Sequence, residues 1–298
     1  MVVLGWATDS SGPTRIIGWP SIAAMRHSRA AQKAVLGQSR CRKDVMANKD
    51  LEGKGAIITG SSRGIGAATA QLIGERGAGV VVNYRSKAPR AKKVVKGIEE
   101  AGGKAVAVQS DLTESQGTQA LVDAAVENFS SVDLLILNAS GGMESDRGED
   151  YALTLNRDAQ VNMVQAAMKV MPKGSQIIFV TSHQAHFIHD VSTMDAYEPV
   201  ARSKRAGEDA LRAMTPALDE LGITLTIVSG DMIEGTITAT LLNRAEPGAI
   251  EARREAAGKL YSVEEFAAEI AALVNKPGLG QAHTELVGGA EDFLARSR

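Results

Sequence analysis

Residues 59–66 read Thr59-Gly60-Ser61-Ser62-Arg63-Gly64-Ile65-Gly66, between an apolar run at 56–59 and a helical pattern at 67–75. Gly60 permits a tight turn, Gly64 lets the backbone approach a bound pyrophosphate, and Gly66 lets the helix pack close to the strand. Free amides at the start of that helix attract phosphate charge. Because a second apolar run follows at 80–83, the stretch predicts a β-α-β unit that binds a nicotinamide dinucleotide.

The rest of the chain repeats this alternation of strand and helix. Apolar runs of strand length occur at 56–59, 80–83, 105–108, 134–138, 176–181, 224–229 and 283–287. Helical patterns occur at 67–75, 88–101, 116–128, 151–170, 203–221 and 263–275. Strands with little polar alternation are typical of a parallel sheet that helices cover on both faces. We therefore predict an α/β fold with a doubly wound parallel sheet of about seven strands in a single domain, 51–298, which is the Rossmann fold.

The composition excludes several classes of protein. The chain has 298 residues, of which 44% are hydrophobic, enough for one large core. No window reaches the roughly 18 consecutive apolar residues of a membrane span. A net charge of -2 gives no sign of a nucleic-acid or membrane partner. The single cysteine, Cys41, rules out an internal disulfide and fits a reducing compartment, so we expect a cytoplasmic protein.

Residues 1–50 differ in character from the rest of the chain. They carry eight Lys or Arg and three Asp or Glu, and they show no sustained apolar period. We expect an N-terminal extension outside the fold. Three interpretations stay open: a disordered tail, an Arg-rich targeting peptide, or sequence upstream of a true start at Met46.

The end of the second strand predicts which dinucleotide binds. An acidic residue there would accept hydrogen bonds from the ribose hydroxyls and select NAD, but the sequence reads Asn83-Tyr84-Arg85-Ser86-Lys87. Arg85, with Ser62 and Arg63 of the turn, is suited to a 2′-phosphate because guanidinium binds phosphate in bidentate geometry. We predict NADP(H) as the cofactor. The alternative is that Arg85 and Lys87 are solvated loop charges.

With Asn138-Ala139-Ser140-Gly141 after the fourth strand, the chain resembles the short-chain dehydrogenase/reductase family over about residues 51–290. Residues 59–66 match its TGxxxGxG motif, Asp111-Leu112 its acidic-apolar pair beside the adenine, and Val287-Gly288-Gly289 its last strand. The resemblance implies that the cofactor is bound by Gly60, Ser62, Arg63, Gly64, Ile65, Gly66, Arg85, Asp111, Leu112, Asn138, Ala139, Ser140, Lys204, Gly230 and Thr236.

The same resemblance implies a catalytic set for reduction of a carbonyl by hydride transfer. In this family a Tyr supplies the proton, a Lys promotes that transfer and holds the ribose, a Ser bonds the carbonyl oxygen, and an Asn anchors a relay water. Asn162 falls at the relay position and Ser182 ends the fifth strand. Lys204, in Ser203-Lys204, begins the helix before the sixth strand. The alternative for Ser182 is a turn or cap serine.

The proton donor departs from the family pattern. The position four residues before Lys204 is Val200, and the nearest phenol is Tyr197, seven residues before it. Both spacings lie on one helical face, but the longer one adds roughly 4.5 Å of axial rise at about 1.5 Å per residue. Pro199 favours an irregular entry to the helix. We predict that the chain folds back at 197–198 and that Tyr197 is the donor; the alternative is a surface tyrosine on a binding-only relative.

The segments after the fifth and sixth strands face the expected substrate. His183, His186 and His189 lie at spacing three, which permits a metal site. No thiolate accompanies them and this chemistry needs no metal, so we expect none and place one or two histidines in the substrate pocket. Residues 231–259 predict a lid, in which Thr236 and Thr238 are candidates for cofactor contact.

These features favour an NADP(H)-dependent oxidoreductase that acts on a carbonyl or secondary alcohol of a small organic molecule. One alternative is a dinucleotide-binding sensor or scaffold protein without dehydrogenase chemistry, which Val200 keeps open. A nucleotide-sugar epimerase or dehydratase ranks last, because the segment after the sixth strand is too short for a sugar-binding domain. The resemblance also implies a homodimer or homotetramer that pairs through the helices at 151–170 and 203–221.

Overall fold

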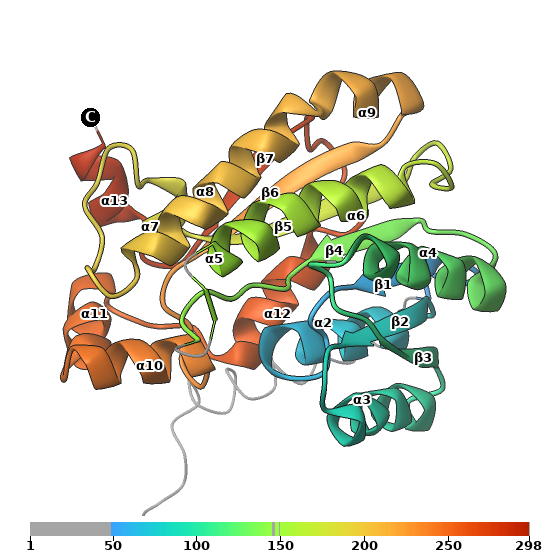
Figure 1. Ribbon diagram of the computed structural model, residues 1–298, viewed down its shortest axis with the longest axis horizontal. Helices are drawn as coiled ribbons and strands as arrows, with labels where there is room; N and C mark the ends of the chain where they lie inside the picture. Colours follow the sequence, from blue (N-terminus) through green and yellow to red (C-terminus); the bar gives the residue numbers. More distant parts are fainter. Residues whose placement is uncertain (1–48, 145–146, 149, 298) are drawn as a thin grey trace, which may run out of the picture. The chain divides into compact units, whose positions relative to one another are not determined.

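The computed structural model describes residues 49–144, 147–148 and 150–297 (Figure 1). The N-terminal extension expected at 1–50 lies outside the described residues except for its last two. Of these, Asp50 forms an ion pair of 2.5 Å with Arg76 at the end of the first helix. Asp50 therefore belongs to the folded unit, although the expected boundary of that unit was residue 51.

Seven parallel strands form one sheet, in the order β3-β2-β1-β4-β5-β6-β7. Their bounds are β1 Gly55–Ile58, β2 Gly79–Tyr84, β3 Lys104–Gln109, β4 Leu134–Leu137, β5 Gln176–Ser182, β6 Thr224–Gly230 and β7 His283–Val287. Each expected strand is present, with its ends shifted by one residue at most. The predicted doubly wound α/β fold is confirmed.

Helices connect the strands and cover both faces of the sheet. The longer ones are α2 Gly64–Glu75, α3 Ala88–Glu100, α4 Ser115–Phe129, α6 Ala159–Ala167, α8 Glu198–Ala213, α10 Ile237–Ala245, α11 Ala249–Ala257 and α12 Val263–Ala272. The shorter ones are α5 Tyr151–Leu153, the π-helical turn η2 Thr154–Asp158, α7 His183–His186, α9 Thr215–Leu221 and α13 Glu291–Arg296. None of the described helices is long and apolar enough to cross a membrane.

Two expected helices differ from the observed ones. The pattern at 151–170 forms α5, η2 and α6 in succession, with a π-helical turn that periodicity does not reveal. The pattern at 203–221 begins earlier, at Glu198, and divides at Met214 into α8 and α9. Pro216 stands in the first turn of α9, where its missing N–H costs least, so the division falls there.

The core consists of two apolar layers, one on each face of the sheet. Ile58 of β1 packs with Ile73 of α2 and Phe266 of α12 on one face. Ile57, the next residue, packs with Leu121 of α4 on the other face, since side chains alternate along a strand. Figure 1 shows α2, α3 and α12 on one side of the sheet and α4, α6 and α8 on the other.

The strand order reverses between β1 and β4. The chain runs outward from β1 through β2 to β3, and then outward in the other direction from β4 to β7. In open parallel sheets of this kind, ligands bind beside the carboxyl ends of the strands at the reversal point. The glycine turn after β1 and the segment after β4 both begin at this point.

Candidate active site

A cavity of about 750 Å³ opens at the carboxyl edge of the sheet. The glycine turn, the ends of β2, β4, β5 and β6, helix α8 and the start of α10 line it. All the residues expected to bind the cofactor are among the lining residues, and so is Thr238. Ser182, Tyr197 and Lys204 also line it. The structure thus places most of the predicted cofactor and catalytic residues around one space.

Asn83 at the end of β2 holds the glycine turn in place. Its Oδ1 accepts a hydrogen bond of 2.9 Å from the backbone N–H of Gly60. Gly66 is required at its position, because a Cβ there would lie 2.5 Å from Asn138 Nδ2. Gly64 has a φ of +55° and open space beside its Cα, where a phosphate can approach. Asn83 was not among the predicted site residues, although a single polar residue at the end of an apolar strand indicates a polar contact there.

Arg85 lies at one end of the cavity, against Tyr151 of α5. Its Nη1 donates a hydrogen bond to the Tyr151 hydroxyl, and the Arg147 guanidinium stands 5.0 Å from the centre of the same ring. Burial by itself would raise the pKa of Asp111, but hydrogen bonds from Thr113 and the charges of Arg85 and Arg147 hold that pKa below its ordinary value. This end of the cavity therefore presents guanidinium groups beside an ionised carboxylate.

Ser182 and Tyr197 meet at the other end of the cavity. The Ser182 Oγ and the Tyr197 hydroxyl lie 3.2 Å apart, within hydrogen-bond distance. Ser182 also caps the short helix α7, since its Oγ accepts a hydrogen bond of 3.3 Å from the N–H of Ala185. The capping interpretation of Ser182 is therefore confirmed, and its catalytic role stays a prediction. The two hydroxyls present a pair of donors to one point in the cavity.

The chain reaches this arrangement without the fold-back expected at 197–198. Tyr197 already has helical backbone angles and is the N-cap of α8, so Lys204 lies in the second turn of the helix rather than at its start. Side chains on a helix tilt toward its N-terminus, which directs the long Lys204 side chain back toward the Tyr197 end. Val200 occupies the turn between them, is 4% exposed and lines the cavity with its apolar side chain.

Asn162 is not placed in this site. Its side chain is exposed on α6 and is not among the lining residues, so its assignment as the relay asparagine is wrong. The buried asparagine nearby is Asn156, in the π-helical turn η2 and 2% exposed. Its amide exchanges hydrogen bonds with the backbone of Gly141 and donates one of 2.9 Å to the Ser203 Oγ. Asn156 thus ties the segment after β4 to α8.

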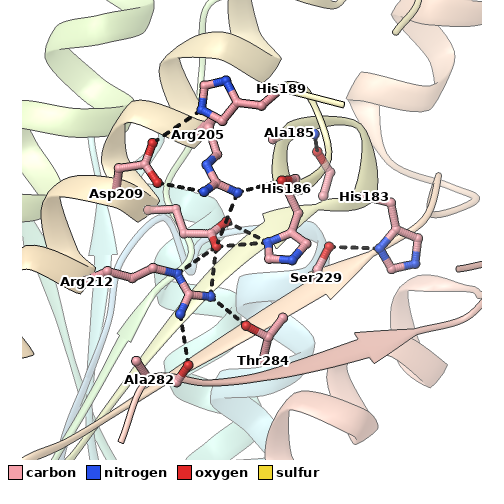
Figure 2. Close-up of polar contacts among 12 residues, drawn as sticks. His183, Ala185, His186, His189, Arg205, Asp209, Arg212, Ser229, Ala282 and Thr284 are labelled. Atoms are coloured by element: carbon pink, nitrogen blue, oxygen red, sulfur yellow. Dashed lines mark hydrogen bonds and ion pairs between the residues drawn. The ribbon is translucent and has the colours of Figure 1, made fainter. Parts of the chain in front are cut away.

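The histidines of the loop after Ser182 form polar contacts with neighbouring residues (Figure 2). They bind separate partners: His183 bonds Ser229 Oγ and the Gly288 carbonyl, His186 bonds Glu208, and His189 lies 3.6 Å from Asp209. None of them is a lining residue, so the expectation that one or two line the substrate pocket is wrong. Helix α7 ends at His186, and the chain beyond it no longer keeps the three-residue spacing on one face. From this loop Gln184 lines the cavity instead.

Glu208 of α8 fixes the position of α7. It is fully buried and accepts hydrogen bonds from His186 Nδ1 at 2.9 Å and from Arg212 Nε at 3.0 Å. Burial opposes its ionisation, yet these two partners hold the pKa of Glu208 below its ordinary value. Arg212 in turn donates to the Ala282 carbonyl and to Thr284 Oγ1 (Figure 2). The helices that carry Ser182 and Tyr197 are therefore joined by a charged network outside the cavity.

The segment after β6 is held over the cavity by Arg253 of α11. Arg253 donates to both carboxylate oxygens of Asp231, at 2.8 and 2.9 Å, and to Asp292 of α13. Thr236 caps α10: its hydroxyl accepts from the Ala239 N–H and donates to the Ile233 carbonyl. The expected cofactor contact of Thr236 stays a prediction, since its hydroxyl already has both partners.

The donor set fits a nicotinamide dinucleotide. Lys204 is only 9% exposed, and no described residue provides a hydrogen bond or ion pair for its ammonium group. Lys204 also lines the cavity, and buried polar groups are normally paired, so its ammonium group calls for a polar ligand there. Ribose hydroxyls and a carboxamide supply such partners.

Comparison with known proteins agrees with this geometry. Residues 54–246 match the family described as short chain dehydrogenase, and the chain belongs to that family. It is 36% identical over 205 residues to an uncharacterised oxidoreductase of Methylorubrum extorquens, covering 63% of this chain and 77% of that protein. It is 31% identical over 207 residues to versicolorin reductase 1 of Dothistroma septosporum, covering 67% and 77%.

The solved structures that resemble this fold include a relative with a bound dinucleotide. A short chain dehydrogenase from Burkholderia cenocepacia in complex with NADP superposes with a TM-score of 0.68 at 30% identity. The match covers 80% of this chain and 96% of the other. The protein is therefore an oxidoreductase of the short-chain dehydrogenase family, which binds a nicotinamide cofactor.

Proposed function

We propose that this protein is an NADP(H)-dependent oxidoreductase that transfers a hydride between the nicotinamide and a carbonyl or secondary alcohol of a small organic molecule. The observation that carries the proposal is the 3.2 Å separation of the Ser182 and Tyr197 hydroxyls in the cavity that the glycine turn also lines. Reduction of a carbonyl creates negative charge on its oxygen, and two hydroxyl donors stabilise that charge.

Each residue of the site has a definite part in the proposed reaction. The Ser182 hydroxyl donates a hydrogen bond to the substrate carbonyl oxygen, and Tyr197 delivers the proton that converts this oxygen into a hydroxyl. Lys204 binds the ribose hydroxyls, and its positive charge stabilises the charge left on the Tyr197 oxygen. The cofactor, when bound, supplies the hydride to the carbonyl carbon. The network through Glu208 keeps the two hydroxyls close together.

The preference for NADP(H) over NAD(H) rests on the end of the cavity that carries Arg85. Arg63, Arg85, Lys87 and Arg90 all line that end, whereas β2 ends without an acidic residue. A 2′-phosphate would take the place of the Tyr151 hydroxyl as the acceptor for the Arg85 guanidinium. The Burkholderia relative solved with NADP supports the same choice. As part of this proposal the protein acts in the cytoplasm as a homodimer or homotetramer.

The binding-only alternative rests on Val200, which stands where the family has its tyrosine. Tyr197 lines the same cavity and is the tyrosine that takes this role in the proposal. We expect the purified protein to consume NADPH with at least one member of a panel of aldehydes and ketones. Lys204→Met should reduce the rate by about 10²-fold or more, because it removes the charge that assists proton transfer. Lys92→Met, on an exposed position of α3, is the matched control. Tight NADPH binding without turnover of any carbonyl would contradict the proposal and favour the binding-only protein.

A further inference from the structure

One part of the cavity wall around Tyr197 is a cluster of apolar side chains. Val200, Met232 and Leu242 are buried in one cluster with Tyr197, and Met143 packs against them. All four line the cavity. Such a wall stabilises a substrate with an apolar body by removing hydrocarbon surface from water. It provides no hydrogen bonds, so a polar residue set into this wall has a large effect on which substrate binds.

Gln184 is such a polar residue. It lies in α7, two positions after Ser182, and it lines the cavity. Its Oε1 accepts a hydrogen bond from the Thr193 hydroxyl, and the backbone N–H of Met194 lies 3.5 Å from the same oxygen. A backbone N–H is a donor only, so these contacts assign the oxygen and the nitrogen of the Gln184 amide. The carboxamide is therefore anchored to the loop through its oxygen.

The nitrogen of the same amide is left available. Its closest polar contact among the described residues is the Met194 sulfur at 3.9 Å, a weak acceptor. Nε2 carries two hydrogens, and an amide donor on a residue that lines an apolar wall gains most from a ligand oxygen, because water there is displaced by the substrate. The anchored oxygen, together with a nitrogen that has only a weak sulfur acceptor, makes Gln184 a preorganised donor two positions after Ser182.

The charges near Gln184 indicate that the oxygen it binds is neutral. Asp231 is already neutralised by Arg253, and Glu144 accepts a hydrogen bond of 2.6 Å from the Gly142 N–H. Among the described lining residues from β5, α7, α8 and the segment after β6, Lys204 is the single cation, and the proposed function assigns it to the cofactor. A carboxylate or phosphate on the substrate would meet no other cation among these residues.

We propose that Gln184 is a specificity-determining residue that donates a hydrogen bond to a second, uncharged oxygen of an apolar carbonyl substrate. This inference rests on the proposed function, because it takes the carbonyl at Ser182 and Tyr197 as the reacting group. The substrate class is then an apolar ketone with a neighbouring ester, keto or hydroxyl oxygen, such as a β-keto ester. A ketone of the same size without that oxygen fills the same wall but leaves the Gln184 amide unpaired.

Binding to the NADP⁺-saturated protein tests this directly, because a ketone cannot be reduced in that complex. The probes are methyl benzoylacetate and valerophenone, which match in length but differ in that only the first carries an ester group beside the ketone. Isothermal titration should show the ester binding about tenfold more tightly than the ketone, the effect of about one hydrogen bond in an apolar site. The same titrations on the cofactor-free protein keep the test independent of whether NADP⁺ binds.

Gln184→Glu separates the donor from the structural role. A carboxylate keeps the oxygen that accepts from Thr193 and Met194, so the loop retains its anchor, while the donor is lost. The variant should lose at least tenfold in affinity for methyl benzoylacetate and leave the affinity for valerophenone within about twofold. Gln116→Glu, on an exposed position of α4, controls for the added charge.

Three results would overturn the assignment: equal affinity of the wild type for the two probes, binding of neither, or an equal loss for both probes in Gln184→Glu. Failure of the proposed function has a different signature. In that case NADPH is not consumed with any carbonyl, while the binding difference between the two probes is still measurable. The two proposals can therefore fail separately.

Discussion

Replacing Tyr197 by Phe removes one hydroxyl from the cavity and leaves the apolar body of the side chain in place. The ring is 5% exposed and belongs to the cluster formed with Val200 and Met232, which Phe would fill equally well. The hydroxyl contacts Ser182 at 3.2 Å. This substitution therefore tests the proton donor with little disturbance of the packing.

The structure allows the catalytic and structural effects to be compared in size. Loss of one neutral hydrogen bond costs about 1 kcal/mol of folding free energy, which shifts the melting temperature by about 2–4 °C in a domain of this size. Loss of a general acid lowers the rate by about 10²–10⁴-fold, equivalent to about 3–5 kcal/mol of activation free energy. The catalytic effect is thus expected to be several times larger than the effect on stability.

The assay is NADPH oxidation with the best substrate from the carbonyl panel, combined with NADPH titration and thermal unfolding of the same samples. We expect kcat/KM to fall by at least about 10²-fold, with NADPH affinity changed by less than about tenfold. Tyr261→Phe is the matched control, since the Tyr261 ring lies against Lys259 and does not line the cavity. If Tyr197→Phe keeps more than about a tenth of the wild-type kcat/KM, Tyr197 is not the proton donor.

Two further predictions concern the cofactor and the pH dependence of stability. Arg85→Ala should raise the KM for NADPH by about 10–100-fold, the size of a lost charge-assisted hydrogen bond, and change that for NADH by less than about threefold; an equal change for both cofactors would refute the 2′-phosphate contact. Burial lowers the pKa of His183 from the ordinary value of 6.5, so the unfolded chain binds this proton more readily than the folded one. The contribution of neutral His183 to the free energy of unfolding should therefore be fully present above pH 6.5. It should decrease as the pH falls below that value, by up to about 1.4 kcal/mol per pH unit for one proton. Urea unfolding at about pH 7.5 and about pH 5.5 should show a smaller loss in His183→Gln than in the wild type, and an unchanged loss would show that other groups cause it.

Much of the fold was predictable because its signals are local. Glycine spacing, strand length and the lack of polar alternation are properties of short segments, and they correctly predicted all seven strands and the parallel arrangement. The residues at the cofactor end of the cavity could be predicted for the same reason. Its residues lie at the carboxyl ends of strands, and a parallel sheet brings those ends to one edge.

The catalytic end could be predicted only in part. The pattern led to Tyr197 for the tyrosine and to Asn162 for the asparagine, and it did not show which side chains face the cavity. A π-helical turn places Asn156 inside and leaves Asn162 exposed, so one extra residue in a turn changes which side chain is buried. The start of α8 at Glu198 likewise set the orientation of Tyr197.

The amino-acid sequence by itself determined the sheet, the glycine turn, the family and the basic residues at one end of the cavity. Only the tertiary structure decided that Tyr197 meets Ser182, that the loop histidines bind Ser229, Glu208 and Asp209, and that Gln184 faces the cavity. The physical reason is that strand and turn preferences arise within a few residues. The direction of a side chain on a loop or helix end is instead set by partners that are distant in the sequence, such as Glu208 for His186.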